Sequence, residues 1–183
     1  MVGVIHRILF KLVESQANRD AVLEVKRLAG VPLEQDFRID EAYDDAEWRR
    51  LMSAACDVLK CTQQQAEQAF ADVFFSDALE RWPAWFKMSS SAREFLERQP
   101  RIHNGFASGV QNPERGAAIN DKFEIEAREH ELVVKYRSPN RLCGLYSSLA
   151  QWIIEYYGDD ASVHETQCLK NGADSCEIHV VWA

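Results

Sequence analysis

The sequence predicts an α+β fold, in which a mainly helical part at about residues 1–115 packs on a β-β-α-β-β unit at about residues 116–183. Two observations predict it. Apolar residues recur every three to four positions in the first part, as in helices, and every second position after residue 115, as in strands. No linker rich in glycine, serine or proline divides the 183 residues. We therefore expect a single domain.

Helical periodicity and capping signals define the elements of the first part. Thr62 followed by Gln65 has the spacing of a capping box, and the helix that it begins carries Phe70 on its apolar face. Pro100 fits the first turn of a short helix that carries His103. The expected helices lie at about residues 4–12, 22–28, 44–60 and from 62, followed by one capped within 89–91 and one beginning at 100.

The second part alternates between strands and one long apolar-faced helix. Two strands joined by a turn at residues 128–130 precede the helix, and two strands joined by a turn that contains Gly172 follow it. The expected strands lie at about residues 123–127, 132–136, 162–168 and 176–182, with the helix at about 141–157. We expect these strands to form a four-stranded antiparallel sheet.

Composition excludes several classes of function. The chain is 46% hydrophobic and 27% charged, which is ordinary for a globular protein. Its 21 lysines and arginines against 29 acidic residues give a net charge of −8, so we expect no nucleic-acid partner. We also expect no membrane partner, because no apolar run is long enough to span a bilayer. His6, Arg7 and Lys11 interrupt the apolar N-terminal stretch, which argues against a signal peptide.

Three of the five cysteines form a candidate metal site. Cys168 and Cys176 flank one hairpin turn, Cys143 begins the preceding helix, and His164 lies four residues before Cys168. Three thiolates and an imidazole are ligands that structural zinc takes in tetrahedral geometry. In a regular strand His164 shares a face with Cys168, whereas Glu165 points the other way. His164 is therefore the expected fourth ligand.

The cysteines also allow a simpler interpretation, in which buried free thiols act as small apolar side chains. Cys56 and Cys61 have no assigned role. An odd number of cysteines without an export signal argues against a disulfide framework and predicts a cytoplasmic protein.

A second candidate site combines His103 with Tyr136, Ser138 and Arg141. The two hydroxyls and the guanidinium can hold the carboxylate or phosphate of a ligand. Alternatively, His103 is a core histidine whose ring nitrogens are satisfied locally. The 138–140 segment can equally be a helix-capping turn, with Arg141 solvated.

Taken in order, these residues resemble the heme nitric oxide/oxygen binding (H-NOX) family, the gas-sensing domains related to the heme domain of soluble guanylate cyclase. The resemblance covers the whole chain, and its last segment looks like the zinc-carrying subset of bacterial members. It rests on the start at residues 1–5, Phe70, His103, the Y-x-S motif at Tyr136 and Ser138, RLC at 141–143 and C-x-x-x-G-A-D-x-C at 168–176.

The resemblance implies a b-type heme between the helical part and the C-terminal unit, with His103 as its proximal ligand. Tyr136 and Ser138 would hydrogen-bond the heme propionates. The family's arginine two places after the serine is Asn140 here, and Arg141 follows one residue later. An amide cannot offset propionate charge as a guanidinium does, so we expect weaker heme retention.

The resemblance also implies a ligand preference. Oxygen-binding members place a tyrosine hydroxyl over the distal face, at a position that is Leu145 here without a gap and Tyr146 with one. The ungapped alignment, with Ile5 nearby, predicts an apolar distal wall that prefers NO and CO to O₂. Pro113 is the candidate for the proline that distorts the heme in the family.

A sensor rather than an enzyme follows from the resemblance. NO binding at ferrous heme would weaken or break the iron–His103 bond and move the N-terminal helices relative to the sheet. Because 183 residues leave no room for a catalytic output module, we expect a separate effector, by family analogy a histidine kinase or a cyclic-di-GMP enzyme. One alternative is a zinc/cysteine redox sensor with heme weakly bound or absent. Another is a heme-free structural or small-molecule-binding module.

Overall fold

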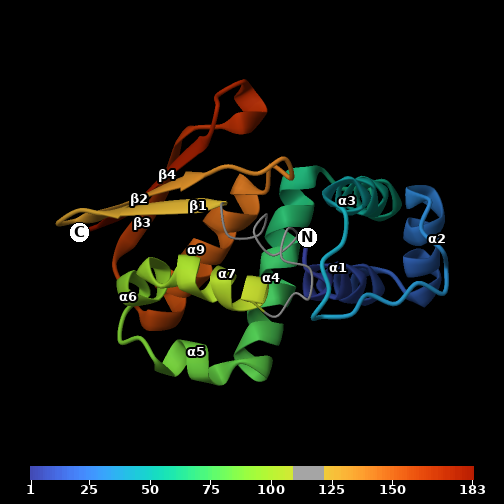
Figure 1. Cartoon of the computed structure of the whole chain (residues 1–183), viewed down its shortest axis with the longest axis horizontal. Coiled ribbons are helices and arrows are strands. Elements are labelled where there is room, and N and C mark those ends of the chain that lie inside the picture. Colours follow the sequence, from blue (N-terminus) through green and yellow to red (C-terminus); the bar gives the residue numbers. More distant parts are fainter. Residues whose placement is uncertain (109–121) are drawn as a thin grey trace.

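The computed structural model describes residues 1–108 and 122–183, without the side chains of residues 106–108. Pro113 lies outside the described residues. Helices come first along the chain and strands follow, as the change of period predicts (Figure 1). Four antiparallel strands form one sheet in the order β1-β2-β4-β3. The predicted α+β fold is confirmed.

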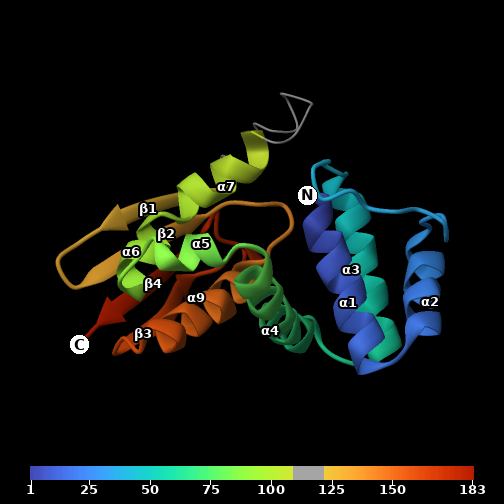
Figure 2. The same ribbon diagram turned by 90° about the horizontal axis from the view of Figure 1, so that it is seen from below.

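The first three helices form a group at one end of the molecule (Figure 2). They are α1 (Gly3–Gln16), α2 (Arg19–Ala29) and α3 (Asp45–Leu59), and each packs against the other two. Asn18 caps α2 by accepting a hydrogen bond from the Ala21 amide. Gly30 ends that helix with a φ of 68°, a left-handed conformation that glycine adopts without a steric cost.

Helix α4 (Gln63–Arg81) joins this group to the rest of the molecule. Its capping box is confirmed, because Thr62 and Gln65 each bond the backbone amide of the other. The helix packs against α1 and also against α9 (Cys143–Tyr157), and Figure 2 shows it between the two ends. Helix α4 therefore contacts both the N-terminal group of helices and the C-terminal unit.

Three short helices follow: α5 (Pro83–Lys87), α6 (Ala92–Glu97) and α7 (Gln99–Ser108). The periodicity predicts α6 and α7 but not α5, which begins at a proline. Ser91 caps α6 by accepting a hydrogen bond from the Glu94 amide. Pro100 lies in the first turn of α7, so the helix that carries His103 forms where the sequence predicts it.

The sheet contains β1 (Phe123–Ala127), β2 (Glu131–Tyr136), β3 (Ala161–Gln167) and β4 (Cys176–Trp182). Tyr136, at the end of β2, pairs with Phe123 on one side and with Cys176 on the other. Helix α9 packs against β3 and β4. The pairing of β3 with β4 shifts register between Glu165 and Gln167, which marks a β-bulge.

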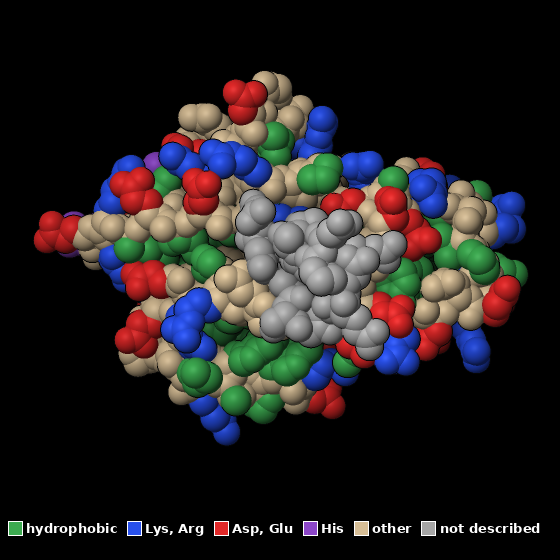
Figure 3. Space-filling model, viewed as in Figure 1, with side chains coloured by type: hydrophobic (Ala, Val, Ile, Leu, Met, Phe, Trp, Pro, Cys, Tyr) green, Lys and Arg blue, Asp and Glu red, His purple; other side chains and the backbone are tan. Residues whose placement is uncertain are grey.

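The surface carries charges of both signs. On the face in Figure 3, acidic and basic side chains are interspersed rather than separated into fields. Within residues 1–108 and 122–183, no helix has the length and apolar character that crossing a membrane requires.

Candidate functional site

An apolar cavity of about 180 Å³ lies between the helical part and the C-terminal unit. Residues of α1, α4, α5, α6, α7, β1, β2 and α9 line it. Among them are Ile5, Phe70, His103 and Tyr136, four residues that the sequence singles out. Apolar walls with a few polar groups are typical of sites that hold an organic cofactor.

His103 contributes an imidazole from α7 to this cavity. Its ring centroid lies 4.7 Å from that of Phe123 on β1. Burial, with a smaller contribution from the positive charge of Lys122, lowers the pKa of His103 to about 4. The ring is therefore neutral at neutral pH, which is the form that binds a metal through a nitrogen lone pair.

Two hydroxyl-bearing residues at and after the end of β2, Tyr136 and Ser138, are buried. Tyr136 lines the cavity, and its hydroxyl oxygen accepts a hydrogen bond of 3.2 Å from the Leu142 amide. Burial raises the pKa of Tyr136 to about 12, so the hydroxyl keeps its proton. Ser138 is buried and accepts a 3.3 Å hydrogen bond from the Asn140 amide.

Asn140 and Arg141 are not part of the cavity wall. Both line a separate surface cavity of about 620 Å³ between α3 and the 139–142 segment. Asn140 is buried and its side-chain oxygen lacks a hydrogen-bond partner within the described part of the chain. Arg141 is exposed, with a left-handed φ of 51°. Neither residue therefore brings a cation into the apolar cavity.

Leu145 and Tyr146 both line the apolar cavity from α9. The Tyr146 ring lies 5.5 Å from that of Phe123, the ring that also contacts His103. The Tyr146 hydroxyl is buried without a hydrogen-bond partner among the described residues. A buried donor without a partner is costly, so this hydroxyl is suited to contact a bound group.

The three predicted cysteines come together in a second site, at the start of α9 and the base of the β3–β4 hairpin. The Cys168 sulfur lies 3.6 Å from that of Cys143 and 4.0 Å from that of Cys176. All three residues are buried. Burial, and hydrogen bonds with Glu165 and Cys168, raise the pKa of the Cys143 thiol.

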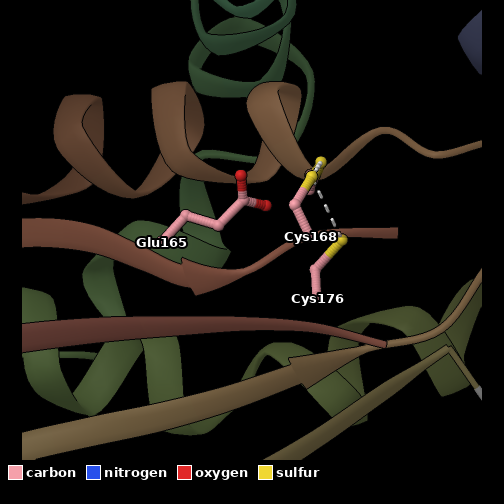
Figure 4. Close-up of side chains that lie close together, drawn as sticks. Glu165, Cys168 and Cys176 are labelled. Atoms are coloured by element: carbon pink, nitrogen blue, oxygen red, sulfur yellow. Dashed lines mark hydrogen bonds between the residues drawn. The ribbon is translucent and has the colours of Figure 1, made fainter. Parts of the chain in front are cut away.

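The fourth group that could bind a metal here is Glu165, whereas the predicted His164 does not belong to the cluster. One carboxylate oxygen of Glu165 and the three sulfurs all lie within 4.8 Å of one another, and Figure 4 shows Glu165 and Cys168 directed to the same side. His164 is exposed, with its Nε2 atom 2.9 Å from the Ser162 hydroxyl.

A β-bulge explains why Glu165 rather than the predicted His164 lies with the cysteines. Regular alternation puts residues 164 and 168 on one face, but an extra residue between Glu165 and Gln167 shifts that alternation by one position. Glu165 therefore shares the face of Cys168. The local sequence carries no signal that predicts this bulge.

An ion pair between a half-buried lysine and a buried glutamate lies next to the thiols. Lys170, in the hairpin, places its Nζ atom 3.0 Å from the Oε1 atom of Glu67 on α4, whose side chain is 1% exposed. The Glu67 carboxylate lies against Gly144, where any Cβ would overlap its Oε2 atom. Burial alone would lower the pKa of Lys170, but the hydrogen bond with Glu67 and the charge of that carboxylate raise it, with smaller contributions from Cys143 and Cys168.

Comparisons with known proteins identify the family and the fold of the chain. Residues 2–165 match the family described as Haem-NO-binding. An H-NOX protein from S. oneidensis in the Fe(II)NO ligation state is similar in structure, with a TM-score of 0.82 at 17% identity over 100% of this chain and 99% of that chain. No curated protein sequence matches the chain.

Two further solved structures share the fold. An oxygen-binding H-NOX domain related to soluble guanylate cyclases, in its oxygen complex, gives a TM-score of 0.75 at 15% identity over 100% of this chain and 95% of that chain. An unliganded Fe(II) H-NOX mutant from K. algicida gives a TM-score of 0.75 at 16% identity over 100% and 97%. These likenesses extend over the full length of the chain.

Proposed function

The chain belongs to the Haem-NO-binding family, whose H-NOX domains bind heme and sense gases, and we propose that it is a sensor of NO and CO that signals to a separate effector protein. The observation that carries the proposal is the neutral imidazole of His103 in an apolar cavity. The effector would be a histidine kinase or a cyclic-di-GMP enzyme, the classes that the family resemblance suggests.

The residues of the cavity fit a b-type heme. Heme, when bound, would supply the iron at which the gas binds. His103 would be the axial ligand. The Tyr136 hydroxyl accepts from the Leu142 amide, which leaves its own proton free for a heme carboxylate. Ser138 would offer a second hydroxyl.

The preference for NO and CO over O₂ is supported by the side chains of Ile5 and Leu145. Both line the cavity, and neither can donate a hydrogen bond to a polarised dioxygen. The Tyr146 hydroxyl can, but the Tyr146 ring packs on Phe123, beside His103. This packing places the Tyr146 ring beside the ring that contacts His103, which supports a distal wall made of the apolar side chains.

Visible spectroscopy on protein produced with a heme precursor tests this function. We expect a Soret band that shifts with NO and with CO in the ferrous state and does not shift with O₂. The absence of a Soret band, even after reconstitution with hemin, would overturn the proposal. If O₂ shifts the band in the wild type and not in Tyr146→Phe, the assignment of an apolar distal wall is wrong.

The signal would pass through the helices that meet at the cavity. His103 lies on α7 and Ile5 on α1, and α4 packs against both α1 and α9. A change in the position of α7 relative to α1 therefore alters how the N-terminal helices sit on the C-terminal unit. That difference between two conformations is what an effector can recognise.

We further propose that Cys143, Cys168, Cys176 and Glu165 hold zinc, as in the zinc-carrying bacterial subset. Tetrahedral zinc with Zn–S bonds of about 2.3 Å separates its sulfurs by about 3.8 Å. The sulfur distances of 3.6 and 4.0 Å agree with that spacing. Elemental analysis should give about one zinc per chain, much less in Cys168→Ser, and an unchanged content in His164→Ala. Equal zinc in the wild type and in Cys168→Ser would exclude the site.

The same cluster supports an alternative function as a redox sensor. Two thiols that form a disulfide lose two protons and two electrons. Hydrogen peroxide accepts both and is reduced to two waters. Loss of two thiolates would release the metal. In heme-free protein, peroxide should then release zinc from the wild type, with recovery on addition of a thiol reductant. Retention of zinc after peroxide treatment would exclude this alternative.

A further inference from the structure

The heme that we propose brings two carboxylates into a chain that lacks the arginine expected at position 140. Asn140 has no charge, and Arg141 lies on the surface cavity. Among the described residues that line the apolar cavity, Lys122 is the one lysine or arginine. Its side chain is only 13% exposed, although burial of a lysine is unfavourable without an anionic partner.

Backbone pairing places Lys122 beside the Tyr136–Ser138 segment. Its carbonyl oxygen accepts a hydrogen bond of 2.9 Å from the Arg137 amide, and Phe123 pairs with Tyr136 in the next position. The lysine thus enters the cavity next to the hydroxyls assigned to the heme carboxylates.

Asp45 contacts both Lys122 and Asn140, the residue at the position where the family has an arginine. Its Oδ2 atom lies 3.6 Å from the Lys122 ammonium group, and its Oδ1 atom lies 2.7 Å from the Met1 amine. Burial alone would raise the pKa of this carboxyl, but the Met1 amine, Asn140 and Lys122 together lower it. Two cations therefore share one carboxylate beside Asn140.

We propose that Lys122 binds a heme carboxylate and takes the place of the arginine that is absent at position 140. The inference rests on the proposed heme function. Burial lowers the pKa of the Met1 amine, so Lys122 is the cation of this group that can attract an anion. Without Lys122, the Met1 amine stays paired with Asp45, and the described residues of the cavity wall contain no other lysine or arginine to offset the charge of the heme.

Hemin dissociation into excess apomyoglobin measures the contribution of Lys122. Relative to the wild type, Lys122→Met should release hemin about tenfold faster, because a charge-assisted hydrogen bond in a mostly buried site is lost. Lys122→Arg should release hemin at close to the wild-type rate. Lys87→Met, which removes an exposed lysine of α5, is the control for net charge. Circular dichroism of each apoprotein verifies folding.

Two further measurements separate a carboxylate contact from a structural effect. The dimethyl ester of hemin lacks the carboxylate charges, so it should leave the wild type and Lys122→Met at equal rates. Adding Asn140→Arg to Lys122→Met should restore slow release of hemin. Equal hemin release from the wild type and Lys122→Met overturns the inference and leaves the heme function intact. A wild type that binds no hemin overturns both.

Discussion

The apolar cavity and the cysteine cluster share helix α9 but differ in what burial does to their metal-binding groups. Leu145 and Tyr146 of α9 line the cavity, and Cys143 at its first residue belongs to the cluster. Burial lowers the pKa of His103 and raises that of the Cys143 thiol. Both groups are therefore uncharged at neutral pH, for the same physical reason.

The consequences of that shared cause are opposite. A neutral imidazole is already the form that binds iron, whereas a thiol must lose its proton before it binds zinc. The cavity can thus accept its cofactor without releasing a proton from His103. The cluster couples metal binding to pH and, through thiolate oxidation, to oxidants.

The largest expected effect comes from removing the imidazole. His103→Ala should lose the axial iron ligand, so the ferrous spectrum changes, and added imidazole should restore it. Zinc content should stay at the wild-type value, because the cluster contains no atom of α7. His130→Ala, at an exposed position in the β1–β2 turn, is the matched control. An unchanged spectrum in His103→Ala would remove His103 as the ligand.

Acid unfolding tests the effect of burial on a histidine that does not line the cavity. His6 is fully buried on α1, stacked on Phe37 with centroids 4.3 Å apart, and burial lowers its pKa to about 4. The unfolded chain, with a histidine pKa near 6.5, therefore binds the proton first. Stability from the neutral ring is present above about pH 6.5 and is lost as the pH falls towards 4.

For His6 that loss is about 3 kcal/mol. His6→Phe should therefore lose less unfolding free energy than the wild-type apoprotein between pH 7 and 4.5, measured by urea denaturation. The contribution of His179 has the opposite sign, because Glu131 and Glu177 raise its pKa and its stabilisation fades as the pH rises. Identical pH profiles for the wild type and His6→Phe would contradict the assignment of a buried neutral imidazole.

What the sequence could predict differs between the two sites. The change of period predicts the order of helices and strands, and the cysteine spacing predicts three of the four groups in the cluster. Periodicity could not predict Glu165, because the bulge in β3 reverses the faces that regular alternation assigns. The role of Lys122 could not be predicted either, because the pairing of its backbone with Arg137 and its contact with Asp45 arise only in the tertiary structure.

The next effect concerns the cluster alone. Lys170→Met leaves the Glu67 carboxylate buried without its cation, which should lower the unfolding free energy of the zinc-free protein by about 1 to 3 kcal/mol. Glu67→Leu in the same chain should recover most of the loss, because the unpaired charge is gone. Lys87→Met, at an exposed position, is the control. A loss of equal size in the double variant would show that packing, not charge, accounts for the effect.

The smallest effect is expected at Gly144, which joins a residue of the cluster to a residue of the cavity wall along α9. Gly144 lies between Cys143 and Leu145, and a Cβ there would overlap the Glu67 carboxylate. Glu67 is fixed by Lys170 and by a 2.6 Å hydrogen bond from Gln63, so it can yield only part of the way. Gly144→Ala should therefore cost about 1 kcal/mol in urea denaturation, and less in a Glu67→Ala background. Because the first turn of α9 must shift to admit the methyl group, zinc content and the heme spectrum should change together in Gly144→Ala. If either changes without the other, α9 does not couple the two sites.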